Sequence, residues 1–173
     1  MTSRQTIELA IVAGLALSAC SASSISVDSF SRTVNGPAGG YEYSLDLDLS
    51  GTGRPETSIL DGTDPGIAIS SGTGQFSGFY SMAWANRGDD EVLLLTGPVA
   101  LNVNFGTGTF ASTSGTLPMN GTVSGTTMDG TVTFRGQPGD LDGLIGTRQA
   151  VGVFQSTGSN IFFAGGFIAA PAP

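Results

Sequence analysis

The chain contains no histidine and no lysine, and its single cysteine is Cys20. Histidine is the side chain that most often serves as a general base or a metal ligand near neutral pH. Its absence removes the commonest catalytic and metal-binding chemistry, and one cysteine can form neither an internal disulfide nor a thiolate metal site. No catalytic constellation is visible among the remaining residues. The sequence therefore predicts a non-enzymatic protein without a cofactor or a bound metal.

Charge is also scarce, and most of it is negative. Charged residues make up 12% of the chain, and 6 basic residues, all arginine, face 14 acidic ones for a formal net charge of −8. A surface of this sign repels phosphate backbones, so we expect no nucleic-acid partner. The abundant residue is glycine, with 27 copies in a chain that is 39% hydrophobic. This composition can build a core and is typical of short strands joined by tight turns.

The N-terminal segment has the layout of a bacterial lipoprotein signal peptide. An apolar run, Ile7–Leu17, is followed by Ser18, Ala19 and Cys20. The run is too short for a transmembrane helix, which needs about 20 residues, but it suits the apolar region of a signal peptide. We therefore expect cleavage between Ala19 and Cys20, removal of residues 1–19, and attachment of acyl chains such as palmitate to Cys20. The alternative is that Cys20 is incidental and the apolar run is a short core helix.

Residues 20–40 are predicted to be a lipidated, flexible tether, because they are rich in serine, glycine and turn residues. A β-barrel domain is predicted for residues 41–173. It opens with a strictly alternating segment, Tyr41–Leu49, in which aromatic and leucine side chains share one face and polar side chains the other. Such alternation indicates a half-buried strand.

Similar alternating segments recur to the C-terminus, and no segment after Cys20 keeps a helical period. Glycines within the strands permit the bends that a small closed barrel needs, and closure removes exposed sheet edges. The sequence therefore predicts an all-β fold: a small antiparallel up-and-down β-barrel of about eight strands. An open sandwich is the alternative.

An ordered set of segments resembles the barrel domain of the transferrin-binding protein B family of bacterial surface lipoproteins. Residues 97–108 are similar to that family's Gly-x-Ala-x-Phe-x-Val-Asp-Phe strand and turn, and residues 121–134 to its Gly-x-Ile-x-Gly-x-x-Phe hairpin. Residues 143–154 resemble the segment that runs from a glycine and aromatic pair to Gly-Gly-x-Phe, and residues 164–167 stand where the family ends its barrel. There is room here for one barrel only.

The resemblance implies the barrel fold and the export route of a stand-alone transferrin-binding-protein-like solute-binding protein. We then expect a lipid anchor in the bacterial outer membrane, facing the periplasm or the cell surface, and an unidentified solute or protein as partner. Two alternatives remain open. One is a structural or envelope-maintenance lipoprotein without a ligand, and the other is a barrel-type protease inhibitor with a projecting segment at residues 114–120.

Three residues are the candidate partner-binding group. Tyr80 and Trp84 share one face of an expected strand, and Arg87 follows in the turn. Aromatic and arginine side chains are enriched at binding hot spots. If the large aromatic side chains all point inward, we expect binding at the loops, with Trp84, Arg87 and the turn at residues 86–90 as the first candidates. The alternative is that Trp84 anchors the barrel core, which would contradict this assignment.

Two pairs of nearby carboxylates are considered as possible sites. Asp140 and Asp142 lie in a segment read as a Gly/Pro loop and are a weak calcium candidate, because the later acidic ligand of a complete calcium loop is missing. Asp46 and Asp48 share a strand face and are interpreted as a solvated outer surface. A plain acidic turn is the favoured interpretation of residues 140–142.

Overall fold

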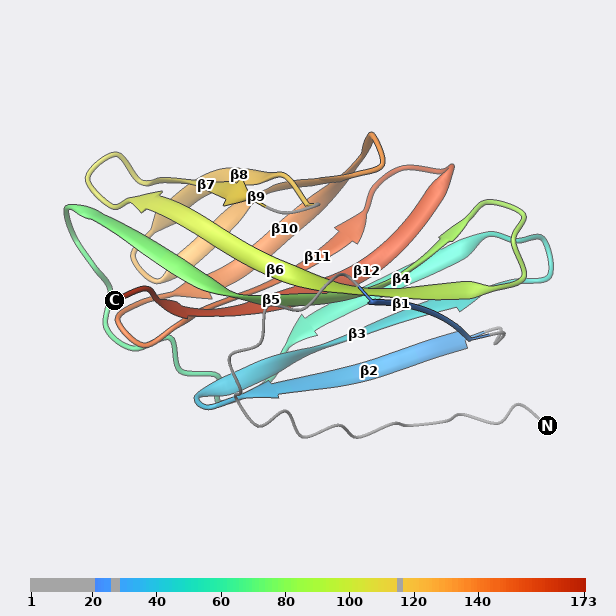
Figure 1. Cartoon of the computed structure of the whole chain (residues 1–173), viewed down its shortest axis with the longest axis horizontal. Coiled ribbons are helices and arrows are strands. Elements are labelled where there is room, and N and C mark those ends of the chain that lie inside the picture. The colour runs from blue at the N-terminus through green and yellow to red at the C-terminus, as the bar shows by residue number, and fades with distance from the viewer. Residues whose placement is uncertain (1–20, 26–28, 115–116) are drawn as a thin grey trace.

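The computed structural model describes residues 21–25, 29–114 and 117–173, and all of their regular structure is β-strand (Figure 1). Cys20 and the expected signal peptide lie outside the described residues. None of the described residues belongs to a helix that could cross a membrane. The strands are β1 (Ser21–Ile25), β2 (Ser29–Gly36), β3 (Gly39–Leu47), β4 (Gly53–Ile59), β5 (Thr73–Asn86), β6 (Val92–Asn104), β7 (Thr109–Ser114), β8 (Met119–Ser124), β9 (Thr127–Phe134), β10 (Gln137–Ile145), β11 (Ala150–Ser156) and β12 (Ile161–Pro171).

Strands β5 to β12 form a closed barrel. Each pairs antiparallel with the next along the chain, and β12 pairs with β5 to complete the ring. The predicted antiparallel up-and-down barrel of eight strands is confirmed. The four segments that carried the family resemblance fall on β6, on the β8–β9 hairpin, on β10–β11 and on the closing strand β12.

The barrel interior is filled by side chains from all of its strands. Because side chains alternate between the two faces of a strand, every second residue of these strands points inward. The largest of the fully buried inward residues are Phe76, Tyr80, Phe154, Phe163 and Phe167. An eight-stranded barrel is just wide enough to be filled in this way or to hold one small ligand. Large buried side chains occupy it here, which favours a binding site on the outside.

Glycines inside the strands make room for these rings. A Cβ atom on Gly152 would lie 2.3 Å from Cε1 of Phe167. A Cβ atom on Gly97 would lie 2.7 Å from the Tyr80 ring. The glycine content that makes the sequence look under-filled is therefore what allows a few aromatic side chains to fill a small barrel.

A second sheet covers part of the barrel's outer surface. Strands β2, β3 and β4 form a three-stranded antiparallel sheet that packs against β11 and β12 (Figure 1). Its inner face buries Phe30, Tyr41, Tyr43 and Leu45 against small and apolar residues on the outside of the barrel. Residues 29–36, expected in the tether, are thus a paired strand of the folded part, and the barrel itself begins at Thr73 rather than near residue 41.

Two local predictions were wrong. Leu49 was expected on the buried face of the first strand, but β3 ends at Leu47 and Leu49 is fully exposed. The Asp48 carboxylate accepts hydrogen bonds from the backbone N–H groups of Ser50 and Thr52, which turns the chain. Residues 137–143 were expected as a loop but belong to β10, because the preceding turn is only two residues long.

A buried polar cluster joins the three-stranded sheet to the barrel. The hydroxyl oxygens of Tyr43 and Ser81 lie 2.7 Å apart, and Arg32 Nη1 donates to the Ser81 hydroxyl at 3.2 Å. Burial raises the pKa of the Tyr43 phenol, although the hydrogen bond to Ser81 and the charge of Arg32 lower it in part. Burial and the neighbouring Tyr43 also raise the pKa of Tyr41.

These shifts predict a loss of stability in alkali. Above pH about 10 the unfolded chain gives up its phenol protons while the folded chain keeps them, so the free energy of unfolding falls by up to about 1.4 kcal/mol per pH unit for each tyrosine. Below that pH both tyrosines are protonated in the folded and the unfolded chain, so they do not change the free energy of unfolding. Urea unfolding followed by circular dichroism at pH 9 and above 10 measures the slope. Tyr43→Phe should make the slope shallower, and an unchanged slope in that variant would contradict the assignment.

Candidate functional site

The structure separates the three residues of the candidate partner-binding group. Tyr80 is 1% exposed and Trp84 is 6% exposed, and both point into the barrel. Arg87 lies in the turn between β5 and β6 and is exposed. The two aromatic side chains therefore belong to the core, and only Arg87 is available to a partner.

Trp84 closes one end of the barrel core. Its ring meets Phe134 edge to face, with the ring centroids 5.5 Å apart. The guanidinium carbon of Arg135 lies 3.9 Å from the centroid of the Trp84 ring, a cation–π contact that covers this end of the core. Arg135 takes a positive φ of 50°, and Gly136 follows with φ 78°, as a two-residue hairpin turn requires. Sequence reasoning missed Arg135, although an Arg-Gly pair between two alternating segments is a signal for such a turn.

Turns gather at this end of the molecule. The N–H of Gly88 in the β5–β6 turn donates to the carbonyl of Gly51 in the β3–β4 turn at 3.0 Å. The N–H of Arg87 donates at 2.9 Å to the carbonyl of Asn160 in the β11–β12 turn. We call residues 48–52, 86–90, 135–136 and 157–160 the turn cluster.

Close backbone contacts fix the turn cluster. Gly51 has φ 69°, and a Cβ atom there would lie 2.4 Å from the Cα of Gly88, so the two turns touch backbone to backbone. The carboxylate of Asp48 accepts three hydrogen bonds, from the Ser50 hydroxyl and from the N–H groups of Ser50 and Thr52. The Ser50 hydroxyl bond and the Thr52 backbone bond lower the pKa of Asp48. This end of the molecule thus presents an exposed leucine, Leu49, and an exposed arginine, Arg87, on turns that are held in place.

The calcium candidates lie on a strand rather than in a calcium-binding loop. Asp140 and Asp142 lie on the outer face of β10, and Asp142 pairs with Asp129 on β9. Within the part of the chain that the structure describes, no three His, Cys, Asp or Glu side chains are placed to share a metal ion. Asp46 and Asp48 are also apart, because Asp46 lies on β3 opposite Arg54 while Asp48 holds the turn.

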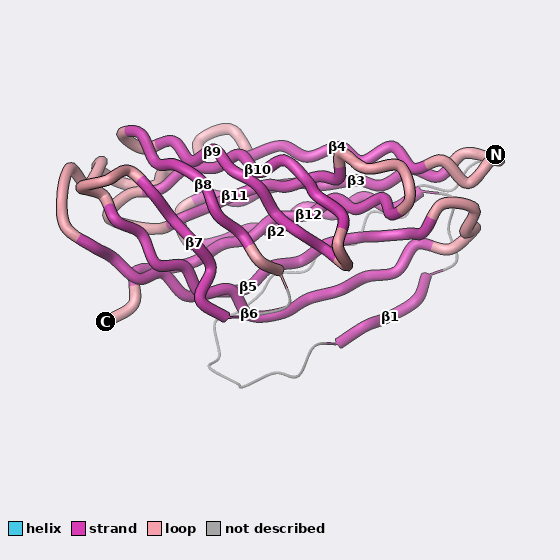
Figure 2. The backbone as a smooth tube through the Cα atoms, turned by 90° about the horizontal axis from the view of Figure 1, so that it is seen from above, coloured by secondary structure: helices cyan, strands magenta, loops and turns pink. Residues whose placement is uncertain are grey.

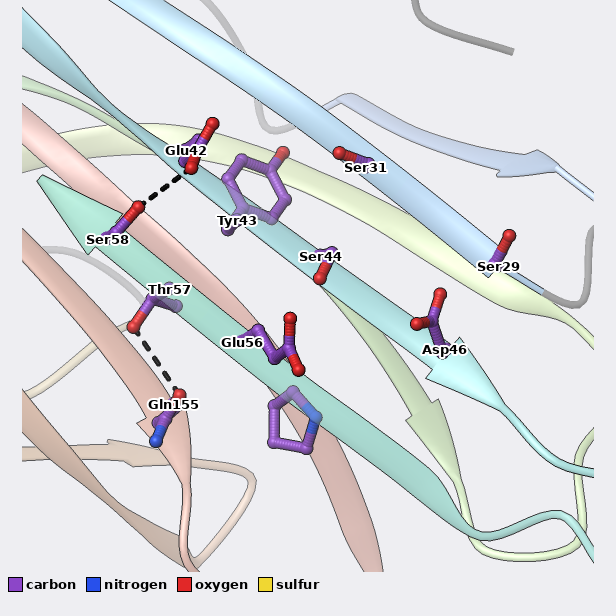
Figure 3. Close-up of a pocket in the computed structure, with 11 residues that line it drawn as sticks. Ser29, Ser31, Glu42, Tyr43, Ser44, Asp46, Glu56, Thr57, Ser58 and Gln155 are labelled. Atoms are coloured by element: carbon purple, nitrogen blue, oxygen red, sulfur yellow. Dashed lines mark hydrogen bonds between the residues drawn. The ribbon is translucent and has the colours of Figure 1, made fainter. Parts of the chain in front are cut away.

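A polar hollow of about 650 Å³ lies along the three-stranded sheet and reaches Gln155 of β11 (Figure 3). Three carboxylates border it, and the Ser58 hydroxyl donates to Glu42 at 2.9 Å. Hydroxyl groups fill the spaces between the carboxylates. The remaining labelled lining residues are Ser29, Ser31, Tyr43, Ser44, Asp46, Glu56, Thr57 and Gln155. In the sequence this face looks like an ordinary solvated strand surface, which is why it was not singled out.

Comparison with known proteins gives similarity of fold but not of sequence. No family model matches the chain, and no curated protein matches it. A surface lipoprotein of known structure superposes with a TM-score of 0.54 at 12% identity, over 76% of this chain and 75% of that one. A transferrin-binding protein B variant from Actinobacillus pleuropneumoniae H49 gives 0.52 at 12% identity, over 76% of each chain.

The isotype 1 transferrin-binding protein B from serogroup B Neisseria meningitidis gives a TM-score of 0.51 at 12% identity, over 83% of this chain and 35% of that one. This chain thus spans about a third of that larger structure. At this level of identity the likeness shows the fold. The fold is the transferrin-binding protein B type of barrel, as the sequence resemblance implied.

Proposed function

We propose that this protein is a lipid-anchored binding protein of the bacterial outer membrane that captures a protein partner with its turn cluster. The observation that carries this proposal is the combination of a filled barrel with one end where rigid turns present Leu49 and Arg87 to solvent. Because large aromatic and aliphatic side chains occupy the interior, we place recognition on the outside. Arginine is enriched at binding hot spots, and a fully exposed leucine adds apolar contact area.

The fold supports a binding role rather than a catalytic one. The similar structures are a surface lipoprotein and proteins named for binding transferrin. The expected anchor at Cys20, with cleavage after Ala19, would place the barrel at the membrane surface. Transferrin itself is one partner to test, because the similar structures carry it in their names, and an envelope protein is the other.

The turn-cluster assignment predicts a specific loss of binding. In the double variant Leu49→Ala/Arg87→Ala we expect capture of the partner to weaken about 30-fold or more, which corresponds to a hot-spot loss of about 2 kcal/mol. The measurement is a pull-down from envelope extracts and, separately, direct binding of purified transferrin. Circular dichroism should show an unchanged cooperative thermal transition, since both side chains are exposed.

The chain offers a matched control at the opposite end of the barrel. Ile67 is also exposed, and Arg148 there forms an exposed ion pair with Asp64. Exposed pairs of this kind contribute little to stability. The double variant Ile67→Ala/Arg148→Ala should therefore capture the partner as well as the wild type. Equal loss in both double variants, or in neither, would contradict the turn-cluster assignment.

A second candidate function is structural, and the filled interior favours it as well. A lipoprotein that maintains the envelope without a ligand needs only a solid barrel and an anchor. If the wild-type protein captures neither transferrin nor any envelope protein, this second function is supported. The inhibitor alternative has less support, because Leu117 and Met119 of its expected projecting segment are buried in the barrel core, while residues 115–116 lie outside the described residues.

A further inference from the structure

The outer wall of the barrel at β5 to β8 carries no charged side chain within those strands. Outside the β5–β6 turn, residues 66–128 contain no Asp, Glu, Lys or Arg. In a chain with a net charge of −8 this is a marked segregation, because the carboxylates among the described residues lie on β9–β10, on the three-stranded sheet and in turns and loops. We call the outward residues of β5–β8 the uncharged wall. They include Ser77, Phe79, Pro98, Asn102, Ala111 and Thr122.

Phe79 gives the wall an apolar projection. Its side chain is 55% exposed, and it pairs with Pro98 on one side and Ile168 on the other. Further along the same wall, a hollow of about 530 Å³ is lined by uncharged residues that include Gln75, Asn102 and Ala111. Amide and hydroxyl groups of this kind can both donate and accept hydrogen bonds.

Strand β1 joins this wall next to the expected anchor. It pairs with residues 92–96 of β6, the part of β6 that β7 does not reach, because β7 pairs only with residues 100–104. Figure 2 shows β1 at the outer edge of the barrel beside β6. Ser21 lies opposite Thr96, and the residue covalently attached before it is the expected lipid-bearing Cys20, which lies outside the described residues.

The short segment between the expected anchor and the folded part restricts the orientation of the barrel relative to the membrane. With β1 paired, Ser21 is held against Thr96 of β6, so a lipid on the preceding residue would have no long tether between it and the barrel. With β1 released, residues 20–28 would span about 16 Å on average and about 30 Å when extended. Carboxylates brought within a Debye length of about 8–10 Å of an anionic membrane are repelled. The outward residues of β5–β8 carry no carboxylate, and the acidic turn at residues 89–91 adjoins only the Val92 end of β6, whereas Ser21 pairs at Thr96.

We propose that the uncharged wall rests on the headgroup surface of the membrane that holds the anchor, and that β1 keeps it there. The barrel then lies on its side, with the three-stranded sheet turned away from the lipid. This proposal rests on the lipid anchor at Cys20, which belongs to the proposed function. The occupant of the wall is a lipid surface, because the wall is uncharged and adjoins the chain's own expected attachment point.

The test places a fluorescent label on each side of the full lipidated protein. The acylated Cys20 leaves no other thiol, so Asn102→Cys on the wall or Ser31→Cys on the three-stranded sheet can be labelled alone. The vesicles contain phosphatidylethanolamine and phosphatidylglycerol with a nitroxide on a fraction of the headgroups. We expect several-fold stronger quenching at residue 102 than at residue 31.

Disrupting β1 provides the second arm. Successive amides of a strand point to opposite sides, so in Ala22→Pro/Ser23→Pro one of the two lost N–H groups faces β6. In that variant the difference between the two labels should disappear, whereas Ala22→Ser/Ser23→Ala, which keeps both N–H groups, should preserve it. Circular dichroism checks that the barrel, which does not include β1, remains folded.

Three results would overturn the proposal. Equal quenching at both positions in the acylated wild type shows that the wall does not face lipid. A label at residue 102 that is shielded from aqueous iodide but not quenched by the nitroxide lipid indicates a second copy or another protein on the wall. If the protein carries no acyl groups, there is no anchor and the proposal is wrong. Mass spectrometry of the same sample distinguishes this result from the other two.

Discussion

Phe167→Ala is expected to lower the free energy of unfolding by about 3–5 kcal/mol. Phe167 is fully buried at the centre of the barrel, and its ring lies over Gly152. Cavities cost more when the surroundings cannot collapse into them, and a glycine has no side chain that could turn to fill the space. The total free energy of unfolding of a small domain is about 5–15 kcal/mol, so this variant should be only marginally stable.

The barrel offers a control of the same side-chain type. Phe79 lies on neighbouring strand β5 but points outward and is 55% exposed, so Phe79→Ala should cost far less than Phe167→Ala. Urea unfolding of the detergent-solubilised protein, followed by circular dichroism, measures both changes. Similar costs for the two variants would mean that the interior is not filled, and the argument for an external binding site would fail with it.

The barrel could be predicted from the sequence because its signal is local. Alternation marks each strand, glycine with polar residues marks each turn, and antiparallel neighbours follow one another along the chain. The turn between β9 and β10 lies before the residues that the sequence pattern assigned to a loop. Pro138 and Gly139 suggested a loop, but the positive φ angles of Arg135 and Gly136 complete the turn before them and leave residues 137–145 free to pair.

The arrangement around the barrel depends on contacts between distant parts of the chain, which alternation does not encode. The β2–β4 segment shows the same pattern whether it closes a barrel or covers one from outside. What decides is the row of small outward residues on the barrel, such as Ala83 and Ala164, against which Tyr41 and Tyr43 pack. Similarly, β1 finds its place because β7 leaves one half of β6 unpaired.

The candidate site was predicted only in part, for a related reason. Period two places Tyr80 and Trp84 on one face but does not say which face is inside. Their burial follows from the register with β12, where Tyr80 pairs with Phe167 and Trp84 with Phe163. Arg87 was recognised as a turn residue, but its neighbours in space, Gly51 and Asn160, come from turns far away in the chain.

Cys20→Ser is expected to remove the protein from the membrane fraction or to leave it as the uncleaved precursor. Transfer of the diacylglyceryl group requires a thiol nucleophile, and a serine hydroxyl is not ionised enough to replace it. Each buried methylene of an acyl chain contributes about 0.8 kcal/mol to membrane binding, so two or three chains hold the protein almost permanently and their loss should be complete.

Flotation of membranes on a density gradient and intact mass measure this outcome. The wild type should float and carry the mass of acyl chains without residues 1–19, while the serine variant should keep residues 1–19 or stay in the soluble fraction. Ser18→Ala keeps a small residue before the cleavage site and should behave as the wild type. Unchanged flotation and mass in Cys20→Ser would show that Cys20 is incidental. The uncharged wall would then have no lipid anchor beside it, and the protein would have to reach the membrane by contacts other than a lipid on residue 20.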